Sequence, residues 1–381
     1  MISPEAVQQL VRSPERKCLT LYFDTGPNQP RSAFRARLNN LLKSVDSRVA
    51  PADRNAFEKS VARVTNYLDQ LRSKNRSVLL FATEKDWQEF TSRVPVRDEV
   101  WWGAPNVNQL LWLLDEYRPY GVLIPDQKKV RFLAVRMNEF EEHREFSAGI
   151  DTREWKKQSL GASNRGGPSN MQKGGHDIDS FNSRYLEKVR AFWTGTHKSI
   201  AELIERYHIK RLIVAGNKSF VPEFVKSLPP KMREGVVTQI PLEAVTSPGE
   251  AVRRIFPGIE AWERKRESAI VSELLNAAGV SAKAAVGVDS ALKYVQSGRA
   301  ARLVISKDFD LDVSRCARCG HVSANHAGAC VGCGAREIEK ARLAGDLPRL
   351  IAQHRLPVEI VRGPAADELT TNGGIGVFLR F

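Results

Sequence analysis

Four of the five cysteines in this chain lie within eighteen residues, and this cluster constrains its segment more than any other sequence feature. They form two C-x-x-C pairs, Cys316–Cys319 and Cys330–Cys333, each followed by a glycine. A C-x-x-C turn points both thiolates at one centre, and two such turns complete the tetrahedron that Zn²⁺ prefers. We predict a four-cysteine Zn²⁺ site, with disulfides or an iron–sulfur cluster as the alternatives.

The predicted zinc is structural, because four protein ligands leave no open position for a substrate. It would stabilise a small segment that could not bury a core unaided. His321 and His326 lie nearby as substitute ligands, but four cysteines already suffice. The remaining cysteine, Cys18, is predicted to be a small buried hydrophobe.

Composition points to a globular protein with a polyanionic partner. A length of 381 residues predicts two or three domains. The net charge is +14, from 58 Lys and Arg against 44 Asp and Glu, which favours nucleic acid first and an anionic membrane second. A generally basic proteome is the alternative. We find no signal peptide or transmembrane run, so we expect a cytoplasmic protein.

The first part of the chain has the pattern of an α/β domain. Residues 18–23 and 77–83 are rich in β-branched and aromatic side chains and are predicted strands. Two amphipathic helices between them have apolar residues at helical spacing: Phe34, Leu38, Leu41, Leu42 and Val45, then Phe57, Val61, Val64, Leu68 and Leu71. We predict that Trp101 and Trp102 belong to the core and do not stack on bases.

The middle of the chain changes to a mixed pattern. Three consecutive strands begin at Gly121 and precede a long loop, followed by a helix from about Asp179 to Tyr207 with Asp179 or Ser180 as its N-cap. Alternating strands and helices follow, which predicts a mixed sheet covered by helices. Ser247-Pro248-Gly249 is a predicted boundary, and a helix from Ile259 to Ala277 opens an αβα region that contains the cysteine-rich insertion.

The loop at residues 151–177 is rich in glycine and basic side chains. Loops this long inside a domain are usually functional or disordered, and glycine pairs permit close backbone approach. We predict RNA contacts for seven residues, with a solvated linker as the alternative: Arg165, Gly166, Gly167, Gln172, Lys173, Gly174 and Gly175. The loop lacks both glycine-rich phosphate-binding patterns. His176-Asp177 is predicted to be a polar entry to the helix and not a catalytic pair.

The last region carries a family resemblance. The segments AVGVDSALKYVQSGRAARLVIS and TTNGGIGVFLRF, with the two C-x-x-C pairs between them, resemble the C-terminal domain of archaeal and eukaryotic class-1 release factors and Pelota. The strands, loop and helix of the middle region are similar to the central domain of the same family. The chain as a whole is most similar to the bacterial release-factor-like proteins, which include the hibernation factor Balon.

This resemblance implies an α/β multidomain fold with three domains. Residues 1–118 would form the N-terminal α/β domain, which matches no codon-reading motif. Residues 119–246 would form an RNase H-like, mixed-sheet central domain. Residues 247–381 would form an αβα domain similar to kink-turn-binding proteins, with a zinc-ribbon insertion at about 312–336.

The resemblance also implies a role for the long loop. In release factors this loop carries Gly-Gly-Gln and enters the peptidyl transferase centre of the ribosome. Here Gly166-Gly167 is followed by Pro168, and Gln172 precedes Gly174-Gly175. Proline has no backbone N–H and a restricted φ, so it does not reproduce the glutamine backbone. Pelota also lacks the tripeptide and acts on ribosomes without hydrolysing the ester.

We therefore predict a ribosome-associated translation factor that binds the A site of stalled or idle ribosomes, for rescue or hibernation. The first alternative is peptidyl-tRNA ester hydrolysis, with Gln172 as the candidate catalytic residue. The second is an RNA-binding module that acts away from the A site. The resemblance implies ribosomal RNA as a partner and a translational GTPase as another, with elongation factor Tu as the bacterial candidate. We expect a monomer off the ribosome and no membrane partner.

Overall fold

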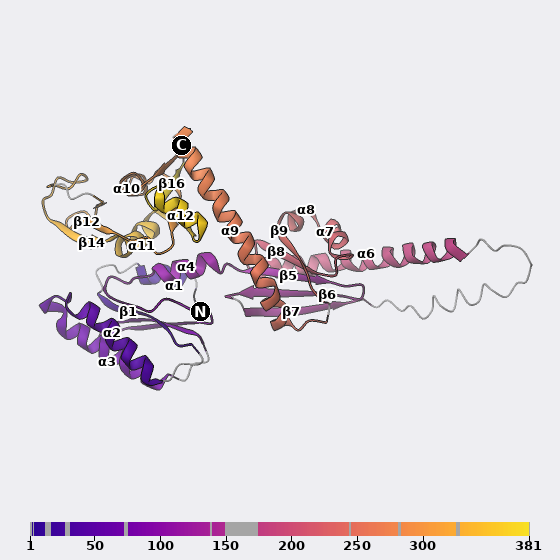
Figure 1. Cartoon of the computed structure of the whole chain (residues 1–381), viewed down its shortest axis with the longest axis horizontal. Helices are drawn as coiled ribbons and strands as arrows, with labels where there is room; N and C mark the ends of the chain where they lie inside the picture. Colours follow the sequence, from indigo (N-terminus) through magenta and orange to yellow (C-terminus); the bar gives the residue numbers. More distant parts are fainter. Residues whose placement is uncertain are drawn as a thin grey trace, which may run out of the picture. The chain divides into compact units, whose positions relative to one another are not determined.

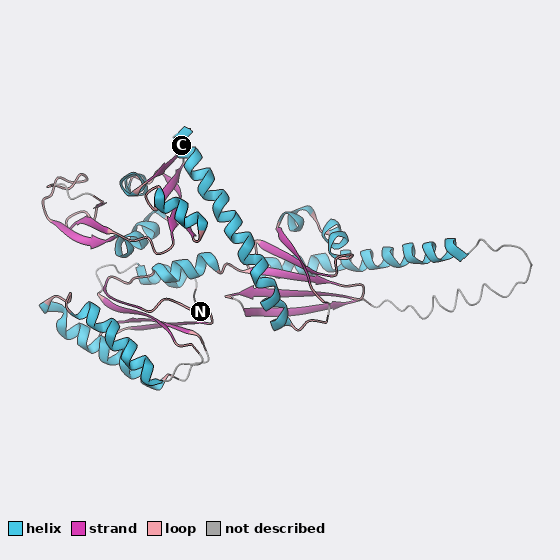
Figure 2. Ribbon diagram, viewed as in Figure 1, coloured by secondary structure: helices cyan, strands magenta, loops and turns pink. Residues whose placement is uncertain are grey.

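The computed structural model describes residues 2, 4–11, 17–26, 31–71, 75–137, 139–148, 174–243, 245–280, 283–324 and 328–380. The chain forms two compact units: unit 1 combines Met1–Arg118 with Glu263–Phe381, and unit 2 is Pro119–Trp262. Each unit contains both helices and strands (Figure 1, Figure 2), so the predicted mixed α/β class is confirmed. The division into three domains stays a prediction.

The first sheet of unit 1 is antiparallel throughout and has the order β3-β2-β1-β4. Its strands are β1 (Cys18–Asp24), β2 (Ser77–Ala82), β3 (Trp87–Ser92) and β4 (Glu99–Gly103). The two strands predicted from their apolar composition, β1 and β2, lie in the centre of the sheet. Their side chains are buried along almost their whole length because the sheet is covered there.

Two long helices cover this sheet, α2 (Arg31–Asp46) and α3 (Arg54–Gln70). All ten periodic apolar residues predicted for them pack in one core cluster with β1 and β2, so this prediction is confirmed. The ring of Trp102 packs edge-to-face on Phe57 with centroids 5.3 Å apart, which confirms a core role for this tryptophan. The shorter helices of this part are α1 (Pro4–Val11), η1 (Pro51–Asp53) and α4 (Asn108–Glu116).

The second sheet of unit 1 has the order β10-β16-β11-β15, with β11 and β15 parallel and the other pairs antiparallel. Its strands are β10 (Ala284–Val286), β11 (Ala300–Ser306), β15 (Val358–Val361) and β16 (Ile375–Leu379). The helices in this part of the chain are α10 (Val288–Gln296), α11 (Leu343–His354) and α12 (Pro364–Thr371). A small third sheet carries the cysteine-rich insertion and has the order β13 (Val322–Ser323), β12 (Asp312–Cys316), β14 (Ile338–Arg342).

Helix α9 (Pro248–Val280) is longer than the predicted helix from Ile259 to Ala277. The helix starts at the predicted boundary, Ser247-Pro248-Gly249. Proline suits the first helical position because the N–H group that it lacks would have no partner there. The amide of Glu250 lies 3.4 Å from Oγ of Ser247. Pro257 inside the helix is tolerated, because the residues around it bury an apolar face in unit 2. Among the described helices, none is long and apolar enough to cross a membrane.

Unit 2 is built on a mixed sheet with the order β7-β6-β5-β8-β9. Its strands are β5 (Tyr120–Pro125), β6 (Lys129–Arg136), β7 (Glu139–Ser147), β8 (Arg211–Gly216) and β9 (Val236–Pro241). The first three form the predicted antiparallel meander, and β8 and β9 add to it in parallel. One face packs on α6 (Gly174–Arg206), α7 (Val221–Ser227) and α8 (Pro230–Glu234), and the other packs on the first half of α9.

Helix α6 begins before the predicted N-cap residues Asp179 and Ser180, which lie inside it. Residues 174–177, predicted to be part of the loop, are therefore helical. Glycine has low helix propensity, which is why the sequence favours a loop at Gly174-Gly175. Two acidic residues follow within six positions, and negative charge stabilises a helix near its N-terminus.

Candidate functional site

The cysteine-rich insertion consists of the strands β12 (Asp312–Cys316), β13 (Val322–Ser323) and β14 (Ile338–Arg342). Strand β12 pairs with both of its neighbours in antiparallel fashion. The insertion thus extends to Arg342, six residues beyond the predicted end at about residue 336. The longer third strand is needed because it pairs with the whole length of β12.

The two C-x-x-C pairs form turns of the same geometry. The amide of Gly320 donates to the carbonyl oxygen of Cys316 at 2.9 Å, and the amide of Gly334 donates to that of Cys330 at 2.8 Å. Both glycines have a left-handed backbone, with φ of +70° and +72°, which glycine adopts without the steric cost of a Cβ. The glycine that follows each pair therefore closes its turn.

The four cysteine sulfur atoms converge on one point, all within 4.8 Å of one another. Sγ of Cys316 lies 3.7 Å from Sγ of Cys333, and Sγ of Cys319 lies 3.6 Å from Sγ of Cys330. A tetrahedral ion with Zn–S bonds of about 2.3 Å would place its sulfurs about 3.8 Å apart, whereas a disulfide bond is about 2.05 Å long. The geometry fits one metal ion and not two disulfides, and the identity of the metal stays a prediction.

The thiols of the cluster interact with one another. The pKa of Cys316 is lowered to about 7, chiefly by the amide of Cys319, whereas the pKa of Cys319 is raised although the backbone hydrogen bond from His321 lowers it. One thiol of this pair therefore loses its proton before the other. His321, a predicted substitute ligand, uses its carbonyl oxygen to accept a hydrogen bond from the amide of Cys316 at 2.9 Å. Its ring lies against Gly332. His326 lies outside the described residues.

Two polar side chains attach this centre to the helices of unit 1. The amide group of Gln296, at the end of α10, makes two hydrogen bonds of 2.8 Å with the backbone of Val322. Arg349 on α11 donates to the carbonyl oxygen of Gly320 at 2.8 Å and lies 3.4 Å from the buried carboxylate of Asp346. The cysteine centre is thereby held against the rest of the unit, and these anchors were not predicted from the sequence.

The second predicted site is the loop between β7 and α6. Arg165, Gly166, Gly167, Gln172 and Lys173 lie outside the described residues, and Gly174 and Gly175 form the first turn of α6. The base of the loop is described, and here the amide of Ala148 donates to the carbonyl oxygen of Lys128 at 2.7 Å. The end of β7 is thus tied to the turn between β5 and β6.

Helix α6 is tied to the same turn of unit 2. Its Tyr185 hydroxyl donates to the side chain of Gln127 at 2.9 Å, and the indole N–H of its fully buried Trp193 donates to the carbonyl oxygen of Asp126 at 3.0 Å. The helix continues from Tyr185 back to Gly174 and projects beyond the end of the sheet (Figure 1). Both ends of the loop are therefore hydrogen-bonded to the same turn, residues 126–128.

Sequence reasoning missed a cluster of buried charges in unit 1, where α4, α9 and β15 meet. Arg264 pairs with Glu116 at 2.7 Å and with Glu267 at 2.8 Å. Arg266 pairs with Glu263 at 2.8 Å and also with Glu359. The four carboxylate side chains are each at most 6% exposed. The charge-rich stretch ERKRE was the available signal, but a charged run on a helix usually faces solvent.

A comparison with known protein families gives one match: residues 105–257 fit the model of the Bacterial archaeo-eukaryotic release factor family 10. The match includes the loop between β7 and α6 and confirms the resemblance inferred from the sequence. No curated protein sequence matches the chain.

Solved structures of related factors are also similar, at low identity. An archaeal translation termination factor, aRF1, is 14% identical over 99% of this chain and 96% of its own, with a TM-score of 0.28. A model of ribosome-bound archaeal Pelota and ABCE1 is 12% identical over 100% and 94%, with a TM-score of 0.43. Dom34 of S. cerevisiae is 8% identical over 80% and 79%, with a TM-score of 0.42. These scores are too low to support an argument about function.

Proposed function

We propose a ribosome-associated translation factor that occupies the A site of stalled or idle ribosomes, because residues 105–257 fit the model of the bacterial archaeo-eukaryotic release factor family 10. Its biological role would be rescue or hibernation. The single observation that carries the proposal is the family match, because it spans the segment that bears the long loop.

The charge of the chain supports a ribosomal partner. A net charge of +14 attracts ribosomal RNA, and each phosphate neutralised by a basic side chain releases counterions. Ribosome binding should therefore weaken steeply as the salt concentration rises. The proposal places this binding in the cytoplasm and off any membrane, by a protein that is a monomer when free.

The loop between β7 and α6 supports a role deep inside the ribosome. Residues 149–173 number 25. Because a loop goes out and returns, about half of them set its reach, and at about 3.3 Å per residue this reach is at most about 40 Å from the base. A base held by hydrogen bonds to the turn at residues 126–128 and a connecting segment of this length suit a probe that enters a narrow RNA channel. We propose that Arg165, Gly166, Gly167, Gln172, Lys173, Gly174 and Gly175 contact RNA near the peptidyl transferase centre.

The residue order of the loop argues for occupancy and against chemistry. Gly166-Gly167 precedes Pro168, and Gln172 stands before Gly174-Gly175, so the Gly-Gly-Gln tripeptide is absent from the sequence. In the alternative, the side chain of Gln172 or the adjacent backbone orients a water molecule against the peptidyl-tRNA ester. The four-cysteine centre would hold structural Zn²⁺ in either case, and a translational GTPase such as elongation factor Tu would deliver the protein.

Co-sedimentation with purified ribosomes tests the binding. We expect association at low salt and its loss at high salt, and absence of association at low salt would remove the proposal. A variant carrying Arg165→Gln and Lys173→Gln should bind more weakly. Its matched control carries Lys218→Gln and Lys231→Gln, two exposed lysines of unit 2, and should bind like the unmodified protein. Equal binding by all three proteins would show that the loop is not an RNA contact.

Release of labelled peptide from stalled ribosome complexes separates the two roles. We expect no release by the unmodified protein although it binds the ribosome. Release that is lost in Gln172→Ala, with ribosome binding intact, would establish the hydrolase alternative and assign it to that side chain. Release that persists in Gln172→Ala but is lost in Gly174→Val, with ribosome binding intact, would assign it to the backbone where the loop enters α6. A preference for isolated structured RNA over ribosomes would favour the third hypothesis.

A further inference from the structure

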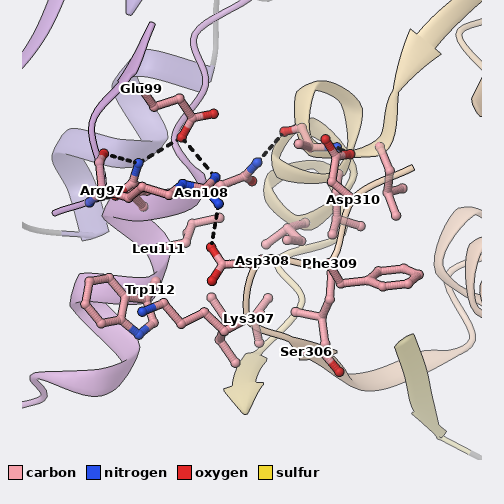
Figure 3. Close-up of a pocket in the computed structure, with 18 of the residues that line it drawn as sticks. Arg97, Glu99, Asn108, Leu111, Trp112, Ser306, Lys307, Asp308, Phe309 and Asp310 are labelled. Atoms are coloured by element: carbon pink, nitrogen blue, oxygen red, sulfur yellow. Dashed lines mark hydrogen bonds and ion pairs between the residues drawn. The ribbon is translucent and has the colours of Figure 1, made fainter. Parts of the chain in front are cut away.

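Unit 1 contains a cavity of about 350 Å³, shown in Figure 3. One wall comes from residues 95–112, around the start of α4, and the other comes from residues 305–310 after β11 together with α11 and β15. This volume lies in the range of small-molecule sites in proteins, which is about 300–1,000 Å³. The site is separate from the cysteine centre and from the long loop, and the inference does not rest on the proposed function.

About half of the cavity wall is aliphatic. Six of the aliphatic side chains that line it share a position between α4 and the second sheet of unit 1: Leu111, Ile305, Leu343, Leu347, Ile351 and Ile360. Leu343 and Leu347 are almost completely buried. A ligand in this cavity would gain about 25 cal/mol for each Å² of apolar surface removed from water, so its body should be apolar.

One cation in the wall has no acceptor. The ammonium of Lys307 lies 3.8 Å from the centroid of the Trp112 ring, and Figure 3 shows the lysine extended over that ring. Among the described residues, no carboxylate or carbonyl oxygen accepts a hydrogen bond from it. Burial is the largest cause that lowers the pKa of Lys307, and the neighbouring Asp308 carboxylate opposes this effect only in part.

The neighbouring acidic side chains are already engaged. Asp308 pairs with Arg97 at 3.2 Å, and Asp310 pairs with Arg342 at 2.7 Å. Glu99 accepts a hydrogen bond from Gln109 at 2.8 Å. The indole N–H of Trp112 is also buried without an acceptor in the described part of the chain. The ammonium of Lys307 and the indole N–H of Trp112 are therefore two donors that an acceptor on a ligand would satisfy, whereas the lining carboxylates Glu99, Asp308 and Asp310 already accept from protein donors.

From this geometry we infer that the cavity binds a small molecule with an apolar body and one carboxylate or sulfonate group. The anionic group accepts hydrogen bonds from Lys307, and the apolar body packs on the aliphatic wall. The ligand touches residues of both sequence segments that make up unit 1, so its binding stabilises their packing and raises the unfolding temperature of this unit.

Fluorescence titration of the full chain with 8-anilinonaphthalene-1-sulfonate, an apolar aromatic sulfonate, tests the inference. We expect saturable binding that octanoate displaces and octylammonium does not. Lys307→Met keeps the length of the side chain and removes its charge, and it should weaken octanoate binding by about 10-fold or more. Lys85→Met, at an exposed lysine in the turn between β2 and β3, is the matched control and should leave the affinity unchanged.

A second variant acts through the volume of the cavity. Leu111→Phe enlarges a half-buried lining side chain and should weaken binding of both 8-anilinonaphthalene-1-sulfonate and octanoate. This variant tests the inference even if Lys307→Met does not fold. Octanoate should also raise the unfolding temperature of the unmodified protein. Equal octanoate affinity in Lys307→Met, displacement by octylammonium instead of octanoate, or unchanged binding in Leu111→Phe would each overturn the inference.

Discussion

Glu116 accepts two hydrogen bonds from the Nη2 atom of Arg264, one on each carboxylate oxygen and both at 2.7 Å. The two residues are 148 positions apart in the sequence, and they join the last turn of α4 to the second half of α9 inside unit 1. A second guanidinium, that of Arg362, lies 2.9 Å from the same carboxylate. One buried glutamate thus holds together three segments that have no covalent neighbour in common.

We expect Glu116→Gln to destabilise unit 1 by about 3 kcal/mol, because two partly buried guanidinium groups then each lose a charged carboxylate partner. The measurement is the urea midpoint of the transition that reports on unit 1. Glu58→Gln removes an exposed carboxylate paired with Arg54 at 3.0 Å and should leave the midpoint unchanged. A midpoint for Glu116→Gln equal to that of the control would show that the pair contributes nothing to stability.

The stability of unit 1 should depend on the protonation of Glu267. Burial raises the pKa of this carboxyl from 4.5 to about 7, so the folded state binds its proton more tightly than the unfolded state. The stabilising contribution is fully present below about pH 4.5 and is lost as the pH rises through about 7. Glu267→Gln, which stays neutral, should flatten this part of the profile of urea midpoint against pH. An unchanged slope between these two pH values would contradict the assignment.

The glycine-rich end of the chain has a packing role that can be tested at Gly374. A Cβ at this position would overlap the ring of Phe309, and the backbone is left-handed with φ of +73°. We expect Gly374→Ala to cost about 3 kcal/mol or more, from steric overlap together with backbone strain.

Gly298 provides the control, because its φ of +71° is similar and the atom nearest to a Cβ at this position would be Nδ1 of His354, at 3.8 Å. Gly298→Ala therefore suffers the backbone strain alone and should cost about 1 kcal/mol. Thermal unfolding of both variants compares the two. Equal losses would mean that the contact with Phe309 relaxes without cost.

Metal analysis of the purified protein should find one Zn²⁺ for each chain. Cys316→Ser should lower this content, because a tetrahedral site loses one of four ligands, while Cys18→Ala at the buried cysteine of β1 should not. Chelation should increase hydrogen exchange in residues 312–342 and leave unit 2 unchanged, since metal binding supplies the folding energy of such small segments. Visible absorption typical of an iron–sulfur cluster would replace zinc as the assignment.

Elements whose cause is local were predictable. The apolar positions from Phe34 to Leu71 follow the helical repeat, and all of them reach the core of unit 1. The cysteine pairs and their glycines are adjacent in sequence, so their turns follow from spacing alone. The predicted start of α6 and the predicted length of α9 were wrong. Both predictions relied on the low intrinsic helix propensity of glycine and proline. In the structure, burial of the neighbouring apolar residues lets α9 continue across Pro257.

The amino-acid sequence alone determined the mixed α/β class, the four-cysteine centre and the family resemblance, since each rests on patterns that span few residues. The tertiary structure decided which distant side chains meet. Lys307 lies over Trp112, and Glu116 meets Arg264, only because the two segments of unit 1 fold against each other. No periodicity encodes such contacts, because their energy depends on burial and on partners more than a hundred residues away.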